Sequence, residues 1–145
     1  MFRAFALGSL VALLSLAGAG AVSHAQAPSS PGEPQAAILA DMQNSVARII
    51  GAEANTVEVK VNRNILVVER VNSNMNNATH SARDNEATAI AGVVSKAIAG
   101  KPEFGAVVSL QVQYLIRQAS DKDGKVVDTV EFRKDPGGGF QFHKT

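Results

Sequence analysis

The sequence predicts an α+β domain in which two helices pack on one face of a four-stranded antiparallel sheet, in the order α-β-β-α-β-β. Three observations predict this fold. Two segments repeat apolar side chains every three or four positions, as amphipathic helices do. Four segments alternate apolar and polar side chains or are short apolar runs, as strands are. Turns that contain asparagine or glycine join these strands in pairs.

The first predicted unit is a helix followed by two strands. The helix covers residues 36–50 and is followed by Gly51, which can adopt the positive φ of a helix end. Residues 56–61 alternate valine with polar side chains, which predicts a strand with one solvated face. After the turn at residues 62–64, a strand at residues 65–71 is predicted, and its centre, residues 65–68, is apolar on both faces, which predicts an interior or covered place in the sheet.

The second predicted unit begins with an asparagine-rich loop, residues 72–77. Turn formation explains these asparagines, and a ligand-contacting loop is the alternative. We expect the second helix to begin at Ser81, because Ser81 and Asp84 nearly match a capping box, and to end before Gly100.

Two further strands follow this helix. One lies within residues 104–118 and the other covers residues 125–133, with a hairpin turn at residues 121–124 between them. Residues 140–143 form a short edge strand or a tail. The order of these elements resembles a circularly permuted ferredoxin-like sandwich and is broadly similar to BON domains, small envelope modules of bacteria. The resemblance is one of fold alone and implies no functional residues.

The N-terminal segment, residues 1–25, has the pattern of an export signal: Arg3, then an uncharged apolar stretch, then small residues. Cleavage is expected after Ala25. Cleavage after Ala27 is the alternative, but it would leave Pro28 next to the cut bond. A retained membrane anchor is the competing interpretation, and the glycine and alanine content and the absence of a following basic cluster count against it.

The remaining chain is predicted to be a proline-rich flexible spacer, residues 26–35, and a single domain, residues 36–145. We expect a soluble protein that is exported to the periplasm or the extracellular space and is not anchored in the membrane after cleavage. The asparagine of Asn77-Ala78-Thr79 would be a glycosylation acceptor only in a eukaryotic secretory pathway.

Composition excludes several classes of function. The chain has no cysteine, which excludes lipoprotein processing, disulfides, thiol catalysis and zinc–thiolate sites. The 14 basic and 13 acidic residues are intermixed along the chain, so no basic stripe for a nucleic acid is expected. No cofactor and no metal are predicted. The DxDG sequence at Asp121 to Gly124 is similar to the start of a calcium loop, but its strand flanks favour a hairpin turn.

Three side chains are the candidates for acid–base chemistry. His80 lies near Ser81 and Asp84, the residue types of a hydrolase triad, although helix capping explains that serine and aspartate. Glu69 and Asp128 each interrupt an apolar alternation, so each is expected on a buried face, paired or with a shifted pKa. If Glu69, His80 and Asp128 converged in one concave pocket, an enzyme would be favoured.

The leading functional interpretation is a non-enzymatic module that binds an envelope protein or a small ligand. Its predicted binding surface is the sheet face without helices together with two aromatic anchors after a glycine run: Ser109, Gln111, Gln113, Arg117, Thr129, Glu131, Arg133, Phe140 and Phe142. A homodimer that forms through this face or through a sheet edge is one form that the binding could take. The alternative function is a small exported enzyme of unknown reaction.

Overall fold

The computed structural model describes residues 32–137 and 139–145. The predicted leader and most of the predicted spacer lie outside the described residues. Short 3-10 helices occur in three of the connections. In chain order the helices and strands are α1 (Glu33–Ile49), β1 (Val57–Asn62), β2 (Ile65–Val71), α2 (His80–Ile98), β3 (Ser109–Ile116), β4 (Lys125–Lys134) and β5 (Phe142–Lys144).

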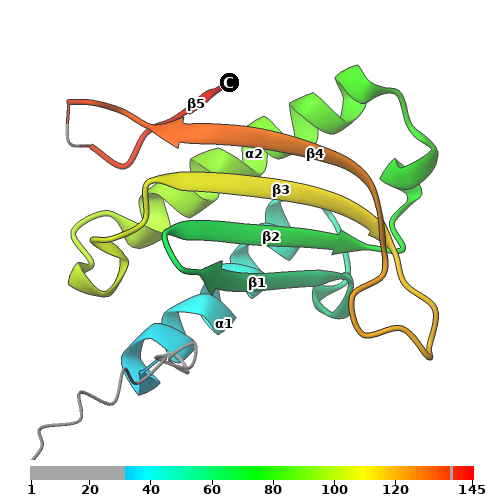
Figure 1. The fold of residues 1–145 in the computed structure, drawn as a ribbon, viewed down its shortest axis with the longest axis horizontal. Helices are drawn as coiled ribbons and strands as arrows, with labels where there is room; N and C mark the ends of the chain where they lie inside the picture. Colours follow the sequence, from blue (N-terminus) through cyan, green and yellow to red (C-terminus); the bar gives the residue numbers. More distant parts are fainter. Residues whose placement is uncertain (1–31, 138) are drawn as a thin grey trace, which may run out of the picture.

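The sheet is mixed, and its strands follow one another in the order β1-β2-β3-β4-β5 (Figure 1). Neighbouring strands are antiparallel except for β2 and β3, which are parallel. The α+β class is confirmed. The prediction of a four-stranded, wholly antiparallel sheet is wrong, both in the number of strands and in the direction of β3, and the sheet departs in the same way from a ferredoxin-like sandwich.

The parallel pair follows from the length of α2, which is the connection between β2 and β3. At about 1.5 Å per residue, the 19 residues of α2 span roughly 28 Å. The seven residues of β2 span only about 23 Å. A single helix therefore carries the chain back to the end of the sheet where β2 began, and β3 must run in the same direction as β2.

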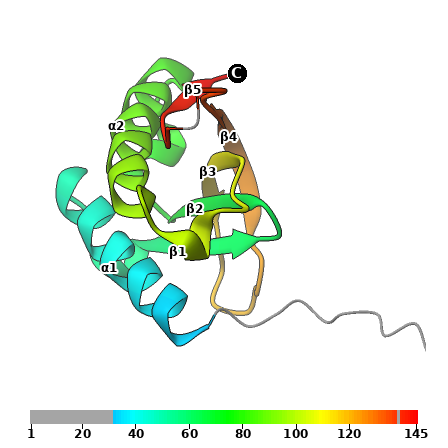
Figure 2. The same cartoon turned by 90° about the vertical axis from the view of Figure 1, so that its left-hand side faces the viewer.

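Both helices cover the same face of the sheet, and the opposite face is open (Figure 2). The core between them contains Met42 and Val46 of α1 and Ile90, Val94 and Ile98 of α2. On the sheet side it contains Leu66, Val68, Leu110, Val112, Tyr114, Val130 and Phe132. All residues of β2 from Leu66 to Val71 are buried, which confirms its predicted interior place. Ile49, the last residue of α1, is exposed.

A β-bulge in β4 determines where Asp128 points. Asp128 lies opposite Tyr114 and Val126 lies opposite Leu115, so Val127 is an extra residue on β4. Residues that face each other across an antiparallel pair share a face. Asp128 therefore lies on the helix side of the sheet with Tyr114, whereas Val126 is turned to the open face.

Candidate functional site

One hollow on the described surface lies between α2 and the residues that follow β4, and we call it the α2–tail groove. Its volume is about 550 Å³. Cavities of this size and of mainly apolar lining are typical of small-molecule sites in proteins. The described residues that line it are Thr88, Ala91, Gly92, Ser95 and Lys96 on α2, Ala99 at its C-cap, Phe132 on β4, and Gly139, Phe140, Gln141 and Phe142.

Small side chains on α2 and aromatic rings on the opposite wall create the space in the groove. Ala91, Gly92 and Ala99 carry at most a methyl group as side chain, and a Cβ built on Gly92 meets no atom within 4 Å. Phe140 and Phe142 are half-buried and pack against the core. These are the two rings that the sequence predicts as apolar anchors, and the structure brings them to one apolar groove.

Several contacts hold the wall that faces α2. β5 pairs with the end of β4, and the backbone N–H of Asp135 donates to the carbonyl of Gln141 at 2.8 Å. The Lys134 ammonium lies 4.0 Å from the ring centroid of Phe140, a cation–π contact. Lys144 of β5 forms an ion pair with Asp84 of α2. The groove therefore has one wall on a helix and one on a segment that is tied to both the sheet and that helix.

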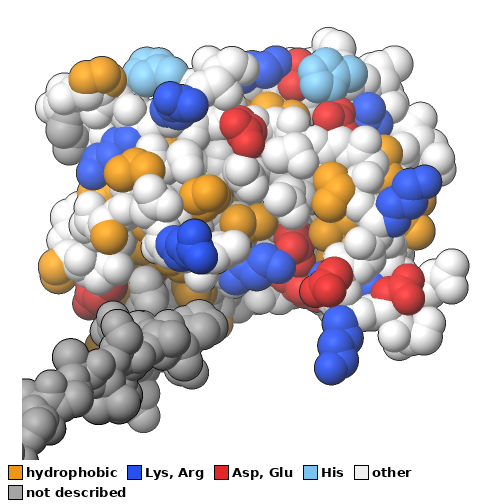
Figure 3. Space-filling view, viewed as in Figure 1, with side chains coloured by type: hydrophobic (Ala, Val, Ile, Leu, Met, Phe, Trp, Pro, Cys, Tyr) orange, Lys and Arg blue, Asp and Glu red, His pale blue; other side chains and the backbone are white. Residues whose placement is uncertain are grey.

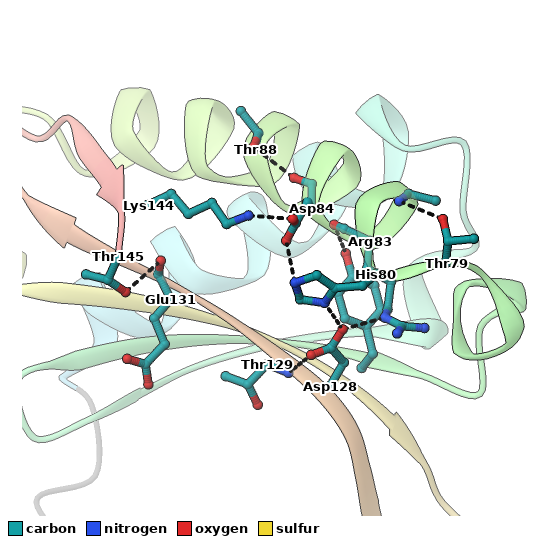
Figure 4. Close-up of polar contacts among 12 residues, drawn as sticks. Thr79, His80, Arg83, Asp84, Thr88, Asp128, Thr129, Glu131, Lys144 and Thr145 are labelled. Atoms are coloured by element: carbon teal, nitrogen blue, oxygen red, sulfur yellow. Dashed lines mark hydrogen bonds and ion pairs between the residues drawn. The ribbon is translucent and has the colours of Figure 1, made fainter.

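Next to this wall, the first turn of α2 is fixed to β4 by a polar cluster (Figure 4). Asp128 accepts hydrogen bonds from Arg83 Nε at 2.6 Å and from its neighbour's N–H at 2.9 Å, and it contacts His80 Nδ1 at 2.8 Å. Burial would raise the pKa of Asp128, but these hydrogen bonds outweigh it and hold the pKa below its ordinary value. The N-cap of α2 is Thr79, whose hydroxyl accepts from Ala82 N–H, so the predicted capping by Ser81 is wrong.

The three acid–base candidates do not meet. His80 and Asp128 are in contact, whereas Glu69 lies on the open face of the sheet, on the other side from α2. His80 Nε2 faces a second carboxylate, Asp84 Oδ1, at 3.6 Å. Neither His80 nor Asp128 lines the α2–tail groove. Glu69 therefore does not join the other two candidates. What the structure brings together is His80 between the carboxylates of Asp84 and Asp128.

Glu69 belongs to a charge network that covers part of the open face. Its carboxylate pairs with Lys60 and, at 3.1 Å, with Arg117 Nη2. Arg117 also pairs with Glu58, and this hydrogen bond is the main reason that the pKa of Glu58 is lowered and that of Arg117 is raised. Glu69 is thus buried and paired, with Lys60 and Arg117 as its partners, but it lies on the open face of the sheet and not on the face that the helices cover.

The other residues predicted on the open face largely satisfy one another. Gln111 donates to Glu131 at 2.7 Å, and Gln113 donates to Gln111 at 3.2 Å. Arg133 lies in the same row, opposite Ser109. Figure 3 shows this face as a mixture of apolar, positive and negative side chains, without an extended area of one charge. The structure separates these residues from Phe140 and Phe142, so they do not form one site.

A second hollow, of about 380 Å³, lies over the guanidinium of Arg70. Arg70 is only 3% exposed, and its Nε donates to Glu86 of α2 at 2.9 Å. Its Nη1 donates to the hydroxyl of Thr56 at 3.2 Å. Of the three charged residues that line this hollow, Arg70 and Glu86 are thus paired with each other and connect α2 to the sheet, and Glu53 is the third.

Sequence reasoning missed the helix wall of the groove and its lysine. The available signal was a second row of small or polar residues on α2 at spacings of three and four, beside the apolar stripe.

Among the residues described, no group of three or more His, Asp and Glu side chains could hold a metal ion. No helix in the described part of the chain is long and apolar enough to cross a membrane.

No protein-family model matches this chain, and neither a curated protein nor a solved structure matches it.

Proposed function

We propose that this protein is an exported, non-enzymatic binding domain that takes a small, largely apolar molecule into the α2–tail groove. The observation that carries the proposal is the lining of the groove. Phe132, Phe140 and Phe142 face the small residues of α2 across a space of about 550 Å³. Burial of apolar ligand surface against such rings supplies the free energy of binding, at about 25 cal/mol per Å².

The open sheet face is a weaker candidate for the ligand site. Its polar side chains form hydrogen bonds and ion pairs with one another, for example Gln111 with Glu131 and Arg117 with Glu69. A ligand on that face would have to replace contacts that already exist. In the α2–tail groove an apolar ligand would displace only water.

The enzyme alternative depends on the contact between His80 and Asp128. His80 Nδ1 contacts Asp128 at 2.8 Å and Nε2 lies 3.6 Å from Asp84 Oδ1, and neither His80 nor Asp128 is among the residues that line the groove. The cluster also has a structural explanation, because it fixes the first turn of α2 to β4. These two points favour the binding function over catalysis.

Fluorescence of Nile red, an uncharged apolar dye, tests the binding site. We expect the purified full chain to bind the dye with increased, blue-shifted emission. Gly92→Leu fills the groove at an open helical position, where it also favours the helix, so it should weaken binding at least about tenfold without loss of stability. Ala40→Leu adds the same side chain to an exposed position on α1 and should leave binding unchanged.

Two results would contradict this site. One is the absence of dye binding to the wild-type chain. The other is equal binding by wild type and Gly92→Leu, with circular dichroism showing both to be folded. Ala99→Leu provides a second variant, because Ala99 lines the groove at the end of α2.

Export is tested separately by expressing the full chain in a bacterium with a Sec pathway. The intact mass of the protein recovered from the periplasm should correspond to a chain that begins at Gln26, after cleavage behind Ala25. A chain that begins at Pro28 would move the cleavage site to Ala27. A full-length chain in the membrane fraction would instead support a retained anchor.

A further inference from the structure

Lys96 is the only charged side chain among the described residues that line the α2–tail groove. It is exposed, and it forms no ion pair with any residue in the described ranges. An apolar groove that contains one unbalanced positive charge is complementary to a ligand with one negative charge.

The other charged side chains near the groove already contact a side chain or a backbone group. Lys144 pairs with Asp84, and Lys134 lies over the ring of Phe140. Asp135 accepts from the backbone N–H of Gly137 and contacts His143 at 3.4 Å, and these two contacts hold the pKa of Asp135 below its ordinary value. None of the described residues that line the groove carries a carboxylate that would repel an anion.

We propose that the ligand of the α2–tail groove is an amphipathic anion, with an apolar chain or ring against Phe132, Phe140 and Phe142 and a negatively charged end at the ammonium of Lys96. This inference rests on the proposed function, and it adds the chemical class of the ligand. The charged end remains at the exposed rim, where it keeps part of its hydration, and the apolar part enters the groove.

Lys96 also lies in the last turn of α2, where a positive charge stabilises the helix. A change in protein stability alone would therefore not show that Lys96 recognises a ligand. The distinguishing measurement is the preference between ligands that differ only in charge, because a contribution to helix stability affects all of them equally.

The experiment measures displacement of Nile red from the full chain by decanoate, 1-decanol and decyltrimethylammonium, each below its micelle concentration. We expect the ratio of decanoate affinity to decanol affinity to fall about fivefold in Lys96→Gln, as for loss of one exposed ion pair. It should fall further in Lys96→Glu, which should bind decyltrimethylammonium most tightly. Lys101→Gln, an exposed lysine outside the groove, should leave the ratio unchanged.

An unchanged ratio in Lys96→Gln and Lys96→Glu, with Nile red still bound, would overturn the anionic ligand class and leave the proposed groove site intact. Absence of Nile red and decanol binding would overturn the proposed function itself. A dimer in sedimentation that Gly92→Leu converts to a monomer would overturn the proposal in favour of a second copy of this chain as the occupant.

Discussion

Asn72 is a single residue that extends the pairing of β2 and β3 beyond the last bridge of the ladder. Its side-chain amide donates to the carbonyl of Arg117 and accepts from the N–H of the same residue, each at 2.8 Å. Its own N–H donates to the carbonyl of Leu115 at 2.9 Å. Its φ of 51° lies in the left-handed region, which asparagine tolerates better than most residues.

Two substitutions of Asn72 separate the contribution of its side-chain hydrogen bonds from that of its positive φ. Asn72→Ala loses both side-chain hydrogen bonds and places a Cβ without amide compensation at positive φ, so we expect a loss of about 2–3 kcal/mol in the free energy of unfolding. Asn72→Gly loses the same bonds but relieves the backbone, and it should be about 1 kcal/mol more stable than Asn72→Ala. Urea denaturation measures both values.

The exposed Asn74 provides the control for this comparison, and Asn74→Ala should change stability by less than about 0.5 kcal/mol. If Asn72→Ala were as stable as Asn74→Ala, the pairing of Asn72 with Arg117 would contribute nothing measurable. This outcome would also remove the structural reason for an asparagine at the start of the polar loop.

At the scale of elements, α2 is the helix that contacts the core, β4 and the α2–tail groove at once. Its apolar stripe contributes to the core, its first turn is bonded to β4, and its outward row of small residues forms one wall of the groove. The buried pair of Arg70 and Glu86 adds an ionic contact between this helix and β2. Tyr114, whose hydroxyl donates to the carbonyl of Arg83 at 2.8 Å, is buried beside that pair, and burial raises its pKa.

Removal of one partner from this pair should destabilise the docking of α2. Glu86→Ala leaves the Arg70 guanidinium buried without a counter-ion, and we expect a loss of about 3 kcal/mol in urea denaturation. The double variant Arg70→Met/Glu86→Leu removes both charges, and it should recover most of that loss. Asn85→Ala, at an exposed neighbouring position, should change stability by less than about 0.5 kcal/mol.

A double variant as unstable as Glu86→Ala would show that the charges themselves, and not only the unpaired guanidinium, are required to hold the helix. In that case the pair would contribute net stability beyond what apolar side chains of similar volume provide.

Helices, strands and turns could be predicted from the sequence because each depends on the spacing of apolar and turn-forming residues over a short stretch of chain. Residues 65–68 of β2 are apolar on both faces, and the structure places this strand between β1 and β3. The direction of β3 is not a local property, since it depends on the path of α2 over the sheet. The same holds for β5, whose three residues become a strand only by pairing with β4.

The candidate site could be predicted only in part, because local sequence patterns do not show which segments meet in the fold. Asp128 and Glu69 could be identified as unusual because a carboxylate interrupts an apolar alternation. Lys96 could not, because a lysine on the outside of a helix has the same local pattern whether it faces solvent or a groove. Phe140 and Phe142 were identifiable as apolar residues after a glycine run, but the helix wall opposite them comes from a segment about 45 residues earlier in the chain.

At the scale of the whole molecule, acidic side chains connect elements through ion pairs that lie outside the hydrophobic core. Asp128 links β4 to α2, and Glu58 links β1 to the segment after β3. The pKa of Asp128 is lowered by its hydrogen bonds from His80, Arg83 and the backbone, against the effect of burial, and that of Glu58 is lowered mainly by Arg117. Both carboxylates are therefore charged in the fold at pH values where the unfolded chain begins to take up protons.

The fold should consequently lose stability in acid. The unfolded aspartate binds its proton near pH 3.8 and the folded one at lower pH, so the stabilisation from Asp128 is complete above that value and is lost as the pH falls through the folded pKa. Asp128→Asn should be less stable than wild type by about 1–2 kcal/mol at pH 7 and should approach it at low pH. Urea denaturation between pH 7 and about pH 2 measures this convergence. Asp123→Asn, in the exposed β3–β4 turn, should run parallel to wild type, and a parallel Asp128→Asn curve would contradict the assignment.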